Sequence, residues 1–528
     1  MKSTLSEASR VFLTLLLLVS AARPCSAQWA ATYAGVGGAD AEFIQQTSDG
    51  GYIVVAESNL IAGGQDFWAF KLDSGGTIEW QNLYGGPALE DVQSIQQTSD
   101  GGYVVAGQTA SFGDPNGDVW VIKLFPNGTL DWQRTYGGAG EDEAIDIRQT
   151  DDDGDGVADD GYIVAGFTDS FGTGGDIWLL KLDALGNVQW QKTYGGGSRD
   201  EPFAVRQTSD RGYIVAGATD SFGPGDQDVW ILKLKPDNAA GGPGQIEWQR
   251  IYGGDDGESA LAVQQTDDDG DGVADDGYAV AGIIDSGAGI FRLWVFKITA
   301  DGSTITWQKI YGDGPRDFAT SIQQTDDDGD GSADDGYIVA GATGIPGDFW
   351  VLKLFPDGNV DWQKAYGGAL SERRAEAIEV TTDGGYITAG TTQSFGTGND
   401  VLVLKLTHDG LIDPSCDFVR DTDARAVDSD ALAEDTDVTG SSTDVTPQAS
   451  SAEARDTDVA NGFVCRATED CVNRIDDDLD GQVDCGDRDC RGDAACAAPV
   501  PAVTPWGWVA LLVVVTLSGL WGLRRRSA

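Results

Sequence analysis

Seven tandem copies of one sequence pattern constrain this chain more than any other feature. From residue 29 to residue 412 the chain repeats WQxxYGG, an acidic turn, IQQT-DGG-YIVAG and D-WVLKL-DG. Three residues mark every copy. They are the first tryptophan (Trp29, Trp80, Trp132, Trp190, Trp248, Trp307, Trp362), the tyrosine of the GY step (Tyr52, Tyr103, Tyr162, Tyr213, Tyr278, Tyr337, Tyr386) and the lysine of WVLKL (Lys71, Lys123, Lys181, Lys233, Lys297, Lys353, Lys405). Because the markers agree on one count, a repeat protein of seven units is predicted.

Each copy contains four short segments rich in Val, Ile, Tyr and Trp, separated by Gly, Asp, Asn and Pro. Such segments predict a four-stranded antiparallel sheet. The copies are 51 to 59 residues long, which is typical of a propeller blade, and the 3.6-residue apolar spacing of a helical repeat is missing. The predicted fold is therefore all-β, a seven-bladed β-propeller over residues 28–415.

Two details of the blade stay open at this stage. The first strand could complete the last blade, or each copy could form one whole blade. The GYIVAG segment carries small residues, so it is expected in the crowded region near the axis.

The motifs WQKxYGG and DGGYIVAG resemble the secreted β-propeller repeats of bacteria and archaea, over residues 29–412. A more distant similarity is to the quinoprotein propeller repeat, whose LDxxTGxxxW step is similar to LDALGNVQW at 182–190. That second resemblance implies eight units and cofactor-stacking residues, which this sequence does not show.

Both ends of the chain carry targeting signals. Residues 1–27 have Lys2 and Arg10 before an apolar run and end in Cys25-Ser26-Ala27, which predicts a signal peptide. Lipidation of Cys25 is the alternative. Residues 506–523 are apolar and uncharged and precede three arginines. A helix of that length spans about 27 Å and predicts a transmembrane helix with its arginines in the cytoplasm; a buried core helix is the alternative.

The tail at 499–528 has the sequence VPAVTPWG, then the apolar stretch, then RRR, and it resembles the IPTL-CTERM sorting signals of bacterial envelope proteins. The resemblance implies a membrane sorting enzyme as a partner, which recognises the tail and can remove it. We therefore expect an exported protein of the cell envelope or cell surface, anchored in the membrane or released after processing.

Three copies replace the short SDGG turn by an eleven-residue acidic insert, at 151–161, 267–277 and 326–336. Each insert reads D-x-D-x-D-G-x-x-D, a spacing typical of calcium loops. The twelfth position lacks the bidentate Glu of an EF-hand, so the inserts resemble thrombospondin type 3 or dockerin loops. Two close carboxylates repel by about 1 kcal/mol in water and about 4 kcal/mol at an effective dielectric of 20, and a divalent cation removes this repulsion. An ion-free acidic hairpin is the alternative. The predicted ligands of structural calcium are Asp151, Asp153, Asp155, Asp159, Asp267, Asp269, Asp271, Asp275, Asp326, Asp328, Asp330 and Asp334.

Two further segments separate the repeats from the tail. Residues 416–465 are rich in Asp, Thr and Ser, repeat a (D/S)TD motif, and are predicted to form a solvated spacer. Residues 466–498 are predicted to form a Cys-rich DxDxDG module. The six cysteines of the mature chain imply three disulfides of open pairing. The module resembles those of bacterial surface proteins, and its predicted calcium ligands are Asp476, Asp478, Asp480 and Asp484.

The net charge of −52 makes nucleic acid an improbable partner, since phosphate binding needs clustered Lys and Arg. His408 is the only histidine, and no Ser-His-Asp, HExxH or Cys-His set can be assembled. The sequence therefore predicts a non-enzymatic surface platform for binding, adhesion or display, with a glycan or a protein as its ligand.

The alternative is a propeller enzyme, a polysaccharide lyase or hydrolase or a quinoprotein-like oxidoreductase, with its site in the central funnel. Unrepeated acids and aromatic residues clustered there would favour it. Phe291 and Arg292, in the most divergent copy, mark one place for a unique site. The acid pairs Asp142-Glu143 and Asp200-Glu201 are expected to cap turns, and the seven lysines to form ion pairs within each blade rather than to line the axis.

Overall fold

The structure is a computed structural model of the chain. It describes residues 28–412 except 35–37, 59–63, 255–256, 286–289, 313, 345–346 and 396–397, and it also describes 418–422, 427–428, 432–435, 441–442, 455–456 and 460–466. The predicted signal peptide, Cys-rich module and sorting tail lie outside these residues, apart from Arg466 at the module's start. None of the described residues forms a helix that could cross a membrane.

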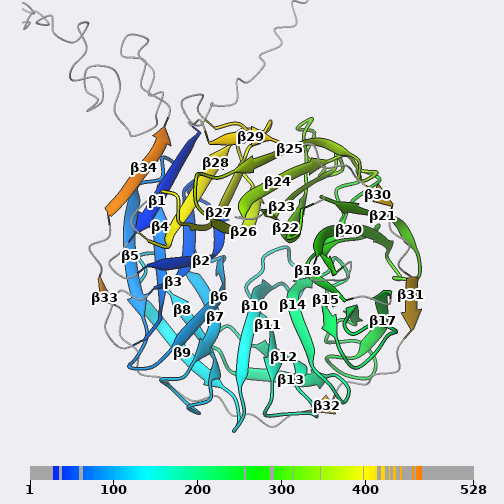
Figure 1. The fold of residues 1–528 in the computed structure, drawn as a ribbon. Coiled ribbons are helices and arrows are strands. Elements are labelled where there is room, and N and C mark those ends of the chain that lie inside the picture. The colour runs from blue at the N-terminus through cyan, green and yellow to red at the C-terminus, as the bar shows by residue number, and fades with distance from the viewer. Residues whose placement is uncertain are drawn as a thin grey trace, which may run out of the picture.

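Seven antiparallel sheets stand around one axis in the described residues (Figure 1). The all-β fold and the seven-bladed propeller are confirmed. The first three blades in chain order contain β2 (Ala39–Gln46), β3 (Tyr52–Ser58), β4 (Asp66–Leu72) and β5 (Ile78–Tyr84); β6 (Glu90–Gln97), β7 (Tyr103–Thr109), β8 (Asp118–Leu124) and β9 (Leu130–Tyr136); and β10 (Asp142–Thr150), β11 (Gly161–Thr168), β12 (Asp176–Leu182) and β13 (Val188–Tyr194).

The next three blades have the same order of strands. They contain β14 (Asp200–Gln207), β15 (Tyr213–Thr219), β16 (Asp228–Leu234) and β17 (Ile246–Gly253); β18 (Glu258–Thr266), β19 (Gly277–Asp285), β20 (Phe291–Thr299) and β21 (Ile305–Tyr311); and β22 (Phe318–Gln324), β23 (Tyr337–Thr343), β24 (Asp348–Leu354) and β25 (Val360–Tyr366).

The seventh blade joins the two ends of the repeat region. It contains β26 (Glu372–Val380), β27 (Tyr386–Thr392), β28 (Asp400–Leu406) and, as its fourth strand, β1 (Trp29–Ala34). Trp29 lies opposite Lys405 in this antiparallel pair. The first strand therefore completes the last blade, and every WQ-type strand is the outer strand of its blade.

The first strand of each blade is the innermost one. The QQT strands, such as β6, line the axis, and the GYIVAG segment forms the second strand, directly next to them. Its small residues serve a bulge in the first strand. In blade 2 the bulge lies between Val92 and Ser94, and a side chain on Gly107 would come within 2.0 Å of the Asp91 carbonyl oxygen.

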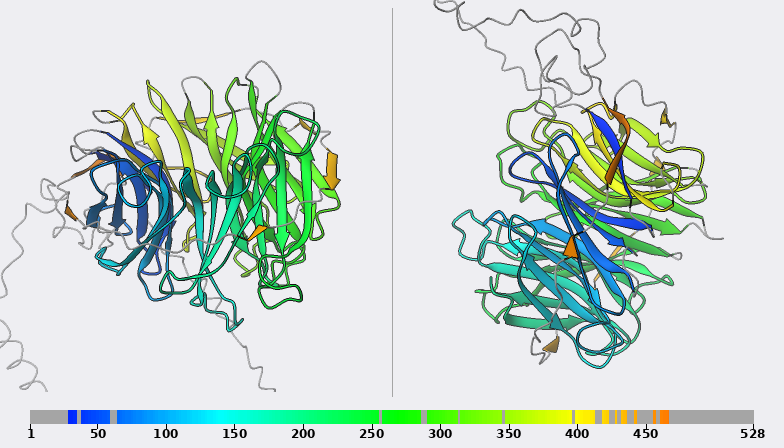
Figure 2. Two further views of the ribbon diagram at one scale, coloured as in Figure 1. Left: turned by 90° about the horizontal axis from the view of Figure 1, so that it is seen from below. Right: turned by 90° about the vertical axis from the view of Figure 1, so that its left-hand side faces the viewer.

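Apolar residues fill the walls between neighbouring blades, which stand face to face (Figure 2). Alternate residues of one strand belong to different walls: Ile53 lies in the core cluster that includes Trp120 of blade 2, and Val54 lies in the one that includes Ile387 of blade 7. Because both faces of the second and third strands are buried, these strands are continuously apolar rather than alternating.

An aromatic contact recurs in all seven walls. The outer-strand tryptophan of one blade packs on the GY tyrosine of the next, as Trp248 does on Tyr278 with ring centroids 5.9 Å apart. The seven pairs are Trp29–Tyr52, Trp80–Tyr103, Trp132–Tyr162, Trp190–Tyr213, Trp248–Tyr278, Trp307–Tyr337 and Trp362–Tyr386.

The tyrosine of each YGG step adds a hydrogen bond across the same wall. The Tyr252 hydroxyl donates to the Gly302 carbonyl at 2.7 Å. The other six bonds are Tyr33–Gly76, Tyr84–Gly128, Tyr136–Gly186, Tyr194–Gly244, Tyr311–Gly358 and Tyr366–Gly410. The WQxxYGG motif thus encodes contacts between blades.

Six short strands follow the seventh blade, and each pairs with the outer strand of one blade. They are β29 (Val419–Asp421), β30 (Val427–Asp428), β31 (Leu432–Asp435), β32 (Ser441–Ser442), β33 (Arg455–Asp456) and β34 (Ala460–Arg466). These parts of the range expected to be a solvated spacer are paired backbone. The spacer stays a prediction for the remainder, which lies outside the described residues.

Candidate functional site

The three acidic inserts each connect the first and second strands of a blade, in blades 3, 5 and 6. In each insert the first, third and fifth aspartates converge, with one carboxylate oxygen of each within 4.8 Å of the others. The converging sets are Asp151, Asp153 and Asp155; Asp267, Asp269 and Asp271; and Asp326, Asp328 and Asp330.

Backbone hydrogen bonds hold these carboxylates in place. The two Asp151 oxygens accept the N–H groups of Gly154 and Gly156, at 2.6 and 2.9 Å. Both glycines have positive φ, +79° and +87°, which lets the chain turn tightly around the carboxylate. The other two inserts repeat this arrangement around Asp267 and Asp326.

The ninth aspartates, Asp159, Asp275 and Asp334, are not part of the converging sets. Loss of solvent contact, followed by the neighbouring Asp155 and Asp160, raises the pKa of Asp159. Asp334 of the blade 6 insert lies beside the blade 5 insert, because a Cβ built on Gly270 would be 2.6 Å from the Asp334 carboxylate. The predicted ligands Asp476, Asp478, Asp480 and Asp484 lie outside the described residues.

Sequence reasoning missed the roles of two other aspartates in each insert. The tenth closes the loop, since the Asp160 carboxylate accepts the N–H groups of residues 152 and 153. The second pairs with the blade lysine, as Asp152 does with Lys181 at 2.8 Å. The fixed register of the DDD run relative to the lysine strand could have indicated the second role.

All seven repeat lysines are buried and ion-paired with an aspartate of their own blade. In the blades with short turns the partner is the SDGG-type aspartate. The pairs are Lys71–Asp49, Lys123–Asp100, Lys181–Asp152, Lys233–Asp210, Lys297–Asp268, Lys353–Asp327 and Lys405–Asp383. This confirms the expectation of ion pairs within each blade.

A cavity of about 630 Å³ lies on the axis, and all seven innermost strands contribute to its lining. A partial ring of glutamines supports it, because the first Gln of QQT accepts an N–H group from the next blade. Gln45 accepts from Gln97, and Gln96 from Gln149, both at 2.7 Å. Glu379 does the same for Gln46 at 3.0 Å.

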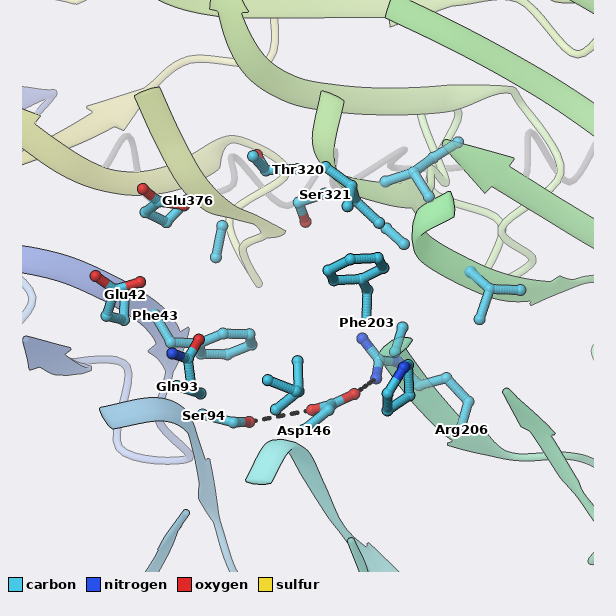
Figure 3. A pocket seen from close by; sticks show the side chains of 18 of the residues that line it. Glu42, Phe43, Gln93, Ser94, Asp146, Phe203, Arg206, Thr320, Ser321 and Glu376 are labelled. Carbon is cyan, nitrogen blue, oxygen red and sulfur yellow. Dashed lines mark hydrogen bonds and ion pairs between the residues drawn. The ribbon is translucent and has the colours of Figure 1, made fainter. Parts of the chain in front are cut away.

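Two arginines interrupt this ring. Arg148 in blade 3 and Arg206 in blade 4 replace the glutamine, and both pair with Asp146, which is 3% exposed. Figure 3 shows the pair of Asp146 with Arg206. Asp146 also accepts hydrogen bonds from the Ser94 hydroxyl, at 3.1 Å, and from the Val205 N–H group, at 3.0 Å. The cluster is specific to blades 3 and 4, so it breaks the sevenfold repetition.

Burial and the neighbouring charges shift the pKa values of Asp146 and Arg148 in this cluster. Burial opposes ionisation of Asp146, but Arg148 and Arg206 outweigh it and hold the pKa of Asp146 below its ordinary value. Burial and the neighbouring Arg206 lower the pKa of Arg148 to about 10. Asp146 and Arg148 therefore remain charged at neutral pH.

Carboxyl groups face the same cavity from blades 1, 3 and 7. Burial raises the pKa of Glu143 to about 8, with Asp91 adding to the effect, and burial raises the pKa of Glu376 to about 7 despite Arg374. Burial also raises the pKa of Glu42, and the proximity of Glu376 contributes. Figure 3 shows Glu42 and Glu376 together, on the side of the cavity away from Arg206.

Aromatic side chains complete the lining. Phe43 and Phe203 come from the innermost strands of blades 1 and 4, and Phe167 comes from the second strand of blade 3. The funnel thus holds unrepeated acids together with aromatic rings. Phe291 and Arg292, where a unique site was expected, are not in the lining, and Arg292 bonds to the Gly312 carbonyl instead.

The paired acids of the sequence separate into two roles. Asp142 and Asp200 cap turns, since each accepts an N–H group from the preceding YGG step, Gly138 or Gly196, at 2.8 Å. Glu143 and Glu201 line the cavity. His408 is exposed and lies 3.1 Å from Asp409, outside the cavity.

Neither a family model nor a curated protein matches the sequence. Quinohemoprotein alcohol dehydrogenase from Comamonas testosteroni is similar in structure, with 10% identity and a TM-score of 0.31 over 67% of this chain and 65% of that one. A mutant of NanB sialidase from Streptococcus pneumoniae has 10% identity and a TM-score of 0.34 over 69% of this chain and 67% of that one. This chain spans less than two thirds of the dehydrogenase, and the likeness concerns the fold alone.

Proposed function

We propose that this chain is a non-enzymatic propeller of the cell envelope or surface that binds a glycan in its axial cavity. The observation that supports this is that the seven copies differ from one another in the lining of the cavity. The walls between blades repeat their contacts seven times, whereas the cavity brings together residues that occur once, such as Asp146, Arg206 and Phe203. A lining without repetition is suited to one specific ligand.

The chemistry of the lining favours a sugar. Carboxylates, the Gln93 amide and the hydroxyls of Thr320 and Ser321 can exchange hydrogen bonds with sugar hydroxyls, and Phe43 and Phe203 can pack on the apolar face of a ring. A volume of about 630 Å³ is in the range of pockets that enclose a small ligand.

Calcium is proposed as a structural ion at the three inserts. Ca²⁺ binds oxygens at about 2.3–2.6 Å, so two of its ligands can be about 5 Å apart, and the converging carboxylates meet this limit. Asp151, Asp267 and Asp326 with their third and fifth neighbours would hold it. When bound, the ion would neutralise carboxylates that otherwise repel one another.

Display outside the cell rests on the signal peptide and the sorting tail expected from the sequence, with the membrane and a sorting enzyme as partners at the tail. A fractionation experiment with and without residues 499–528 tests this part. Retention in the membrane fraction should be lost on deletion.

The binding proposal is tested by a glycan array with the mature protein in calcium. We expect binding of a restricted set of glycans, lost in Glu42→Gln/Glu376→Gln and kept in Asp131→Asn, a substitution at the exposed position of the outer strand of blade 2. Equal binding by all three proteins would contradict a site in the cavity.

Two observations favour a hydrolase as a second candidate. The unrepeated acids and aromatic rings in the funnel are the feature expected of a propeller enzyme. With its pKa at about 8, Glu143 is protonated at neutral pH and could serve as a general acid. Incubating the bound glycan with the protein and following its reducing ends decides between the two. Cleavage that is lost in Glu143→Gln would support the enzyme, and an intact glycan would support the binding protein.

A further inference from the structure

The strands that follow the seventh blade run around the outside of the propeller. We call residues 419–466 the strap. Its strands take the blades in reverse order: β29 joins blade 6, β30 blade 5, β31 blade 4, β32 blade 3, β33 blade 1 and β34 blade 7. Within the described residues, blade 2 has four strands, with β9 outermost.

The register of the strap is the same on every blade that it reaches. One strap residue lies opposite the outer-strand residue two places after the WQ-type tryptophan. The six pairs are Asp421–Lys364, Asp428–Lys309, Asp435–Arg250, Ser442–Lys192, Asp456–Asn82 and Phe463–Ala31.

Successive strap positions differ by seven residues for each blade that the strap passes. Fourteen residues separate Ser442 from Asp456, and over this distance the strap passes from blade 3 to blade 1. This distance equals two steps of seven, and the intermediate position, 449, corresponds to blade 2. Seven extended residues reach at most about 25 Å.

We propose that the strap encircles the propeller in seven-residue units, one per blade, and that residues 449–451 pair with β9 of blade 2. Ala449 then lies opposite Arg134, the residue two places after Trp132. The outer strand of a blade can pair with one more strand through its backbone N–H and C=O groups.

The unit on blade 6 shows how a strap residue contacts its blade. The Trp350 indole N–H donates to the Thr422 hydroxyl at 3.1 Å, and that hydroxyl donates to Gln363 Oε1 at 2.8 Å. Thr422 therefore joins the third strand of the blade to its outer strand. Arg420 adds an ion pair with Asp348.

The same hydroxyl position recurs in the sequence of every unit up to blade 1. It is occupied by Thr422, Ser429, Thr436, Thr443, Ser450 and Thr457. The corresponding blades supply the tryptophan and glutamine as Trp350 and Gln363, Trp294 and Gln308, Trp230 and Gln249, Trp178 and Gln191, Trp120 and Gln133, and Trp68 and Gln81.

Three of these tryptophans independently support the hydroxyl contacts that the register assigns to them. In the described part of the chain, the indole N–H groups of Trp68, Trp230 and Trp294 are buried without a hydrogen-bond partner. An unpaired buried donor costs about 1–3 kcal/mol, so an acceptor is expected at each. Thr457, Thr436 and Ser429 supply it if their units repeat the blade 6 geometry.

Blade 7 is an exception on both sides of the contact. It has Leu402 in place of the tryptophan and Ala30 in place of the glutamine, and its strap unit has Val464 in place of the hydroxyl. A hydroxyl there would have no polar partner, and an apolar side chain suits the apolar site. The hydroxyl pattern of the strap and the Trp–Gln pattern of the blades are thus both broken at blade 7.

Charge also matches along the strap. Asp421, Asp428 and Asp435 lie opposite Lys364, Lys309 and Arg250, and apolar Phe463 lies opposite Ala31. At blades 4, 5 and 6 the outer edge therefore fits an acidic segment of the chain itself, whereas Ser442 and Asp456 lie opposite Lys192 and Asn82.

Disulfide trapping in the full chain tests the unit on blade 2. Ser450→Cys with Gln133→Cys should cross-link on mild oxidation, because the register places these residues opposite each other, and peptide masses separate this link from links of native cysteines. Thr422→Cys with Gln363→Cys is the positive control. Ser451→Cys with Gln133→Cys is shifted by one residue and should cross-link at least tenfold less. Equal yields at 450 and 451, with the control linked, would overturn the proposal.

A second measurement needs no cross-link. Thr436→Val/Thr443→Val removes two hydroxyls that the register assigns to Trp230 and Trp178, whereas Thr439→Val/Thr446→Val makes the same change three residues further along. We expect the melting temperature to fall by about 2 °C or more in the first variant only. Equal melting of the two variants would contradict the hydroxyl contact.

Discussion

The walls between blades and the lining of the axial cavity come from the same seven repeats, yet they repeat to different degrees. Each wall has the same Trp–Tyr contact and the same Tyr–Gly hydrogen bond. In the lining, one axial position is occupied in turn by Glu42, Gln93, Ile145, Phe203, Leu261, Thr320 and Glu376. A wall residue contacts two blades, so a change there costs stability. A lining residue faces a cavity, so it can be specialised for a ligand.

The largest expected effect tests this contrast directly. Trp178 is fully buried in a wall and Phe203 is half-buried in the lining. Trp178→Ala should lower the free energy of unfolding by about 4–5 kcal/mol, because it leaves a large cavity in a packed wall. Phe203→Ala should cost much less. Denaturant unfolding of both variants measures the difference, and equal losses would remove the distinction.

The Asp146 cluster is the one part of the lining that should behave like a wall. Asp146→Ala leaves Arg148 and Arg206 close together without their shared carboxylate, and we expect a loss of about 3 kcal/mol. Ser94→Ala removes only one hydrogen bond to Asp146 and is the matched control. A neutral Asp146→Ala variant would show that the cluster does not support the fold.

The acidic inserts break the repetition at one end of blades 3, 5 and 6. If each holds calcium, an ion concentration a hundredfold above its Kd adds about 2.7 kcal/mol per site. Replacing 267–277 by the short turn SDGG should remove one such contribution from the difference in melting with calcium and with chelator. Melting that is insensitive to chelator in the parent protein would exclude structural calcium.

Walls and lining should also differ in their pH dependence. Burial raises the pKa of Glu143 to about 8 and of Glu379 to about 7, so the folded state binds protons that the unfolded state has released. Stability from these groups is complete below about pH 4.5 and is lost as pH rises to about 8. Glu143→Gln/Glu379→Gln should flatten this decline.

The lysine pairs within the blades act in the opposite direction. Asp100, Asp210 and Asp383 lose solvent, but hydrogen bonds to Thr and backbone groups and the paired lysine hold their pKa below the ordinary value. Their contribution is present above about pH 4 and is lost as pH falls further. Unfolding measured from pH 3 to pH 9 should therefore show a maximum on the acidic side of neutrality. A steady rise in stability to pH 8 would contradict these assignments.

The smallest expected effect separates packing from hydrogen bonding in a wall. Tyr252→Phe keeps the ring and removes the donor to the Gly302 carbonyl. A loss of about 1 kcal/mol is expected, well below that of Trp178→Ala. Tyr252→Ala should approach the tryptophan value, because it also removes the ring.

The repeat count, the four strands of each blade and the all-β class could be predicted from the sequence, because the markers recur once per blade and the strands have strong β-forming composition. The lysine ion pairs could be predicted for the same reason. The role of the small residues in GYIVAG could not. Small residues near an axis and small residues beneath a bulge, as at Gly107, leave the same signature in the sequence.

The candidate site was only partly predictable. The DxDxDG spacing was sufficient to find the three converging aspartates, since they are local in the chain. The cavity was not found, because Asp146 and Arg206 are sixty residues apart and each resembles an ordinary drift of the repeat. The described strands after the seventh blade were not predictable, because a segment poor in apolar residues usually remains solvated.

The amino-acid sequence alone determined how many blades form and which residues repeat in their walls, because these contacts are the same in every copy and a periodic pattern records them. Only the tertiary structure decided which unrepeated side chains meet at the axis and which blades the described strands after the last blade join. Both depend on bringing distant segments to one place, and the seven blades do this by standing around a common axis.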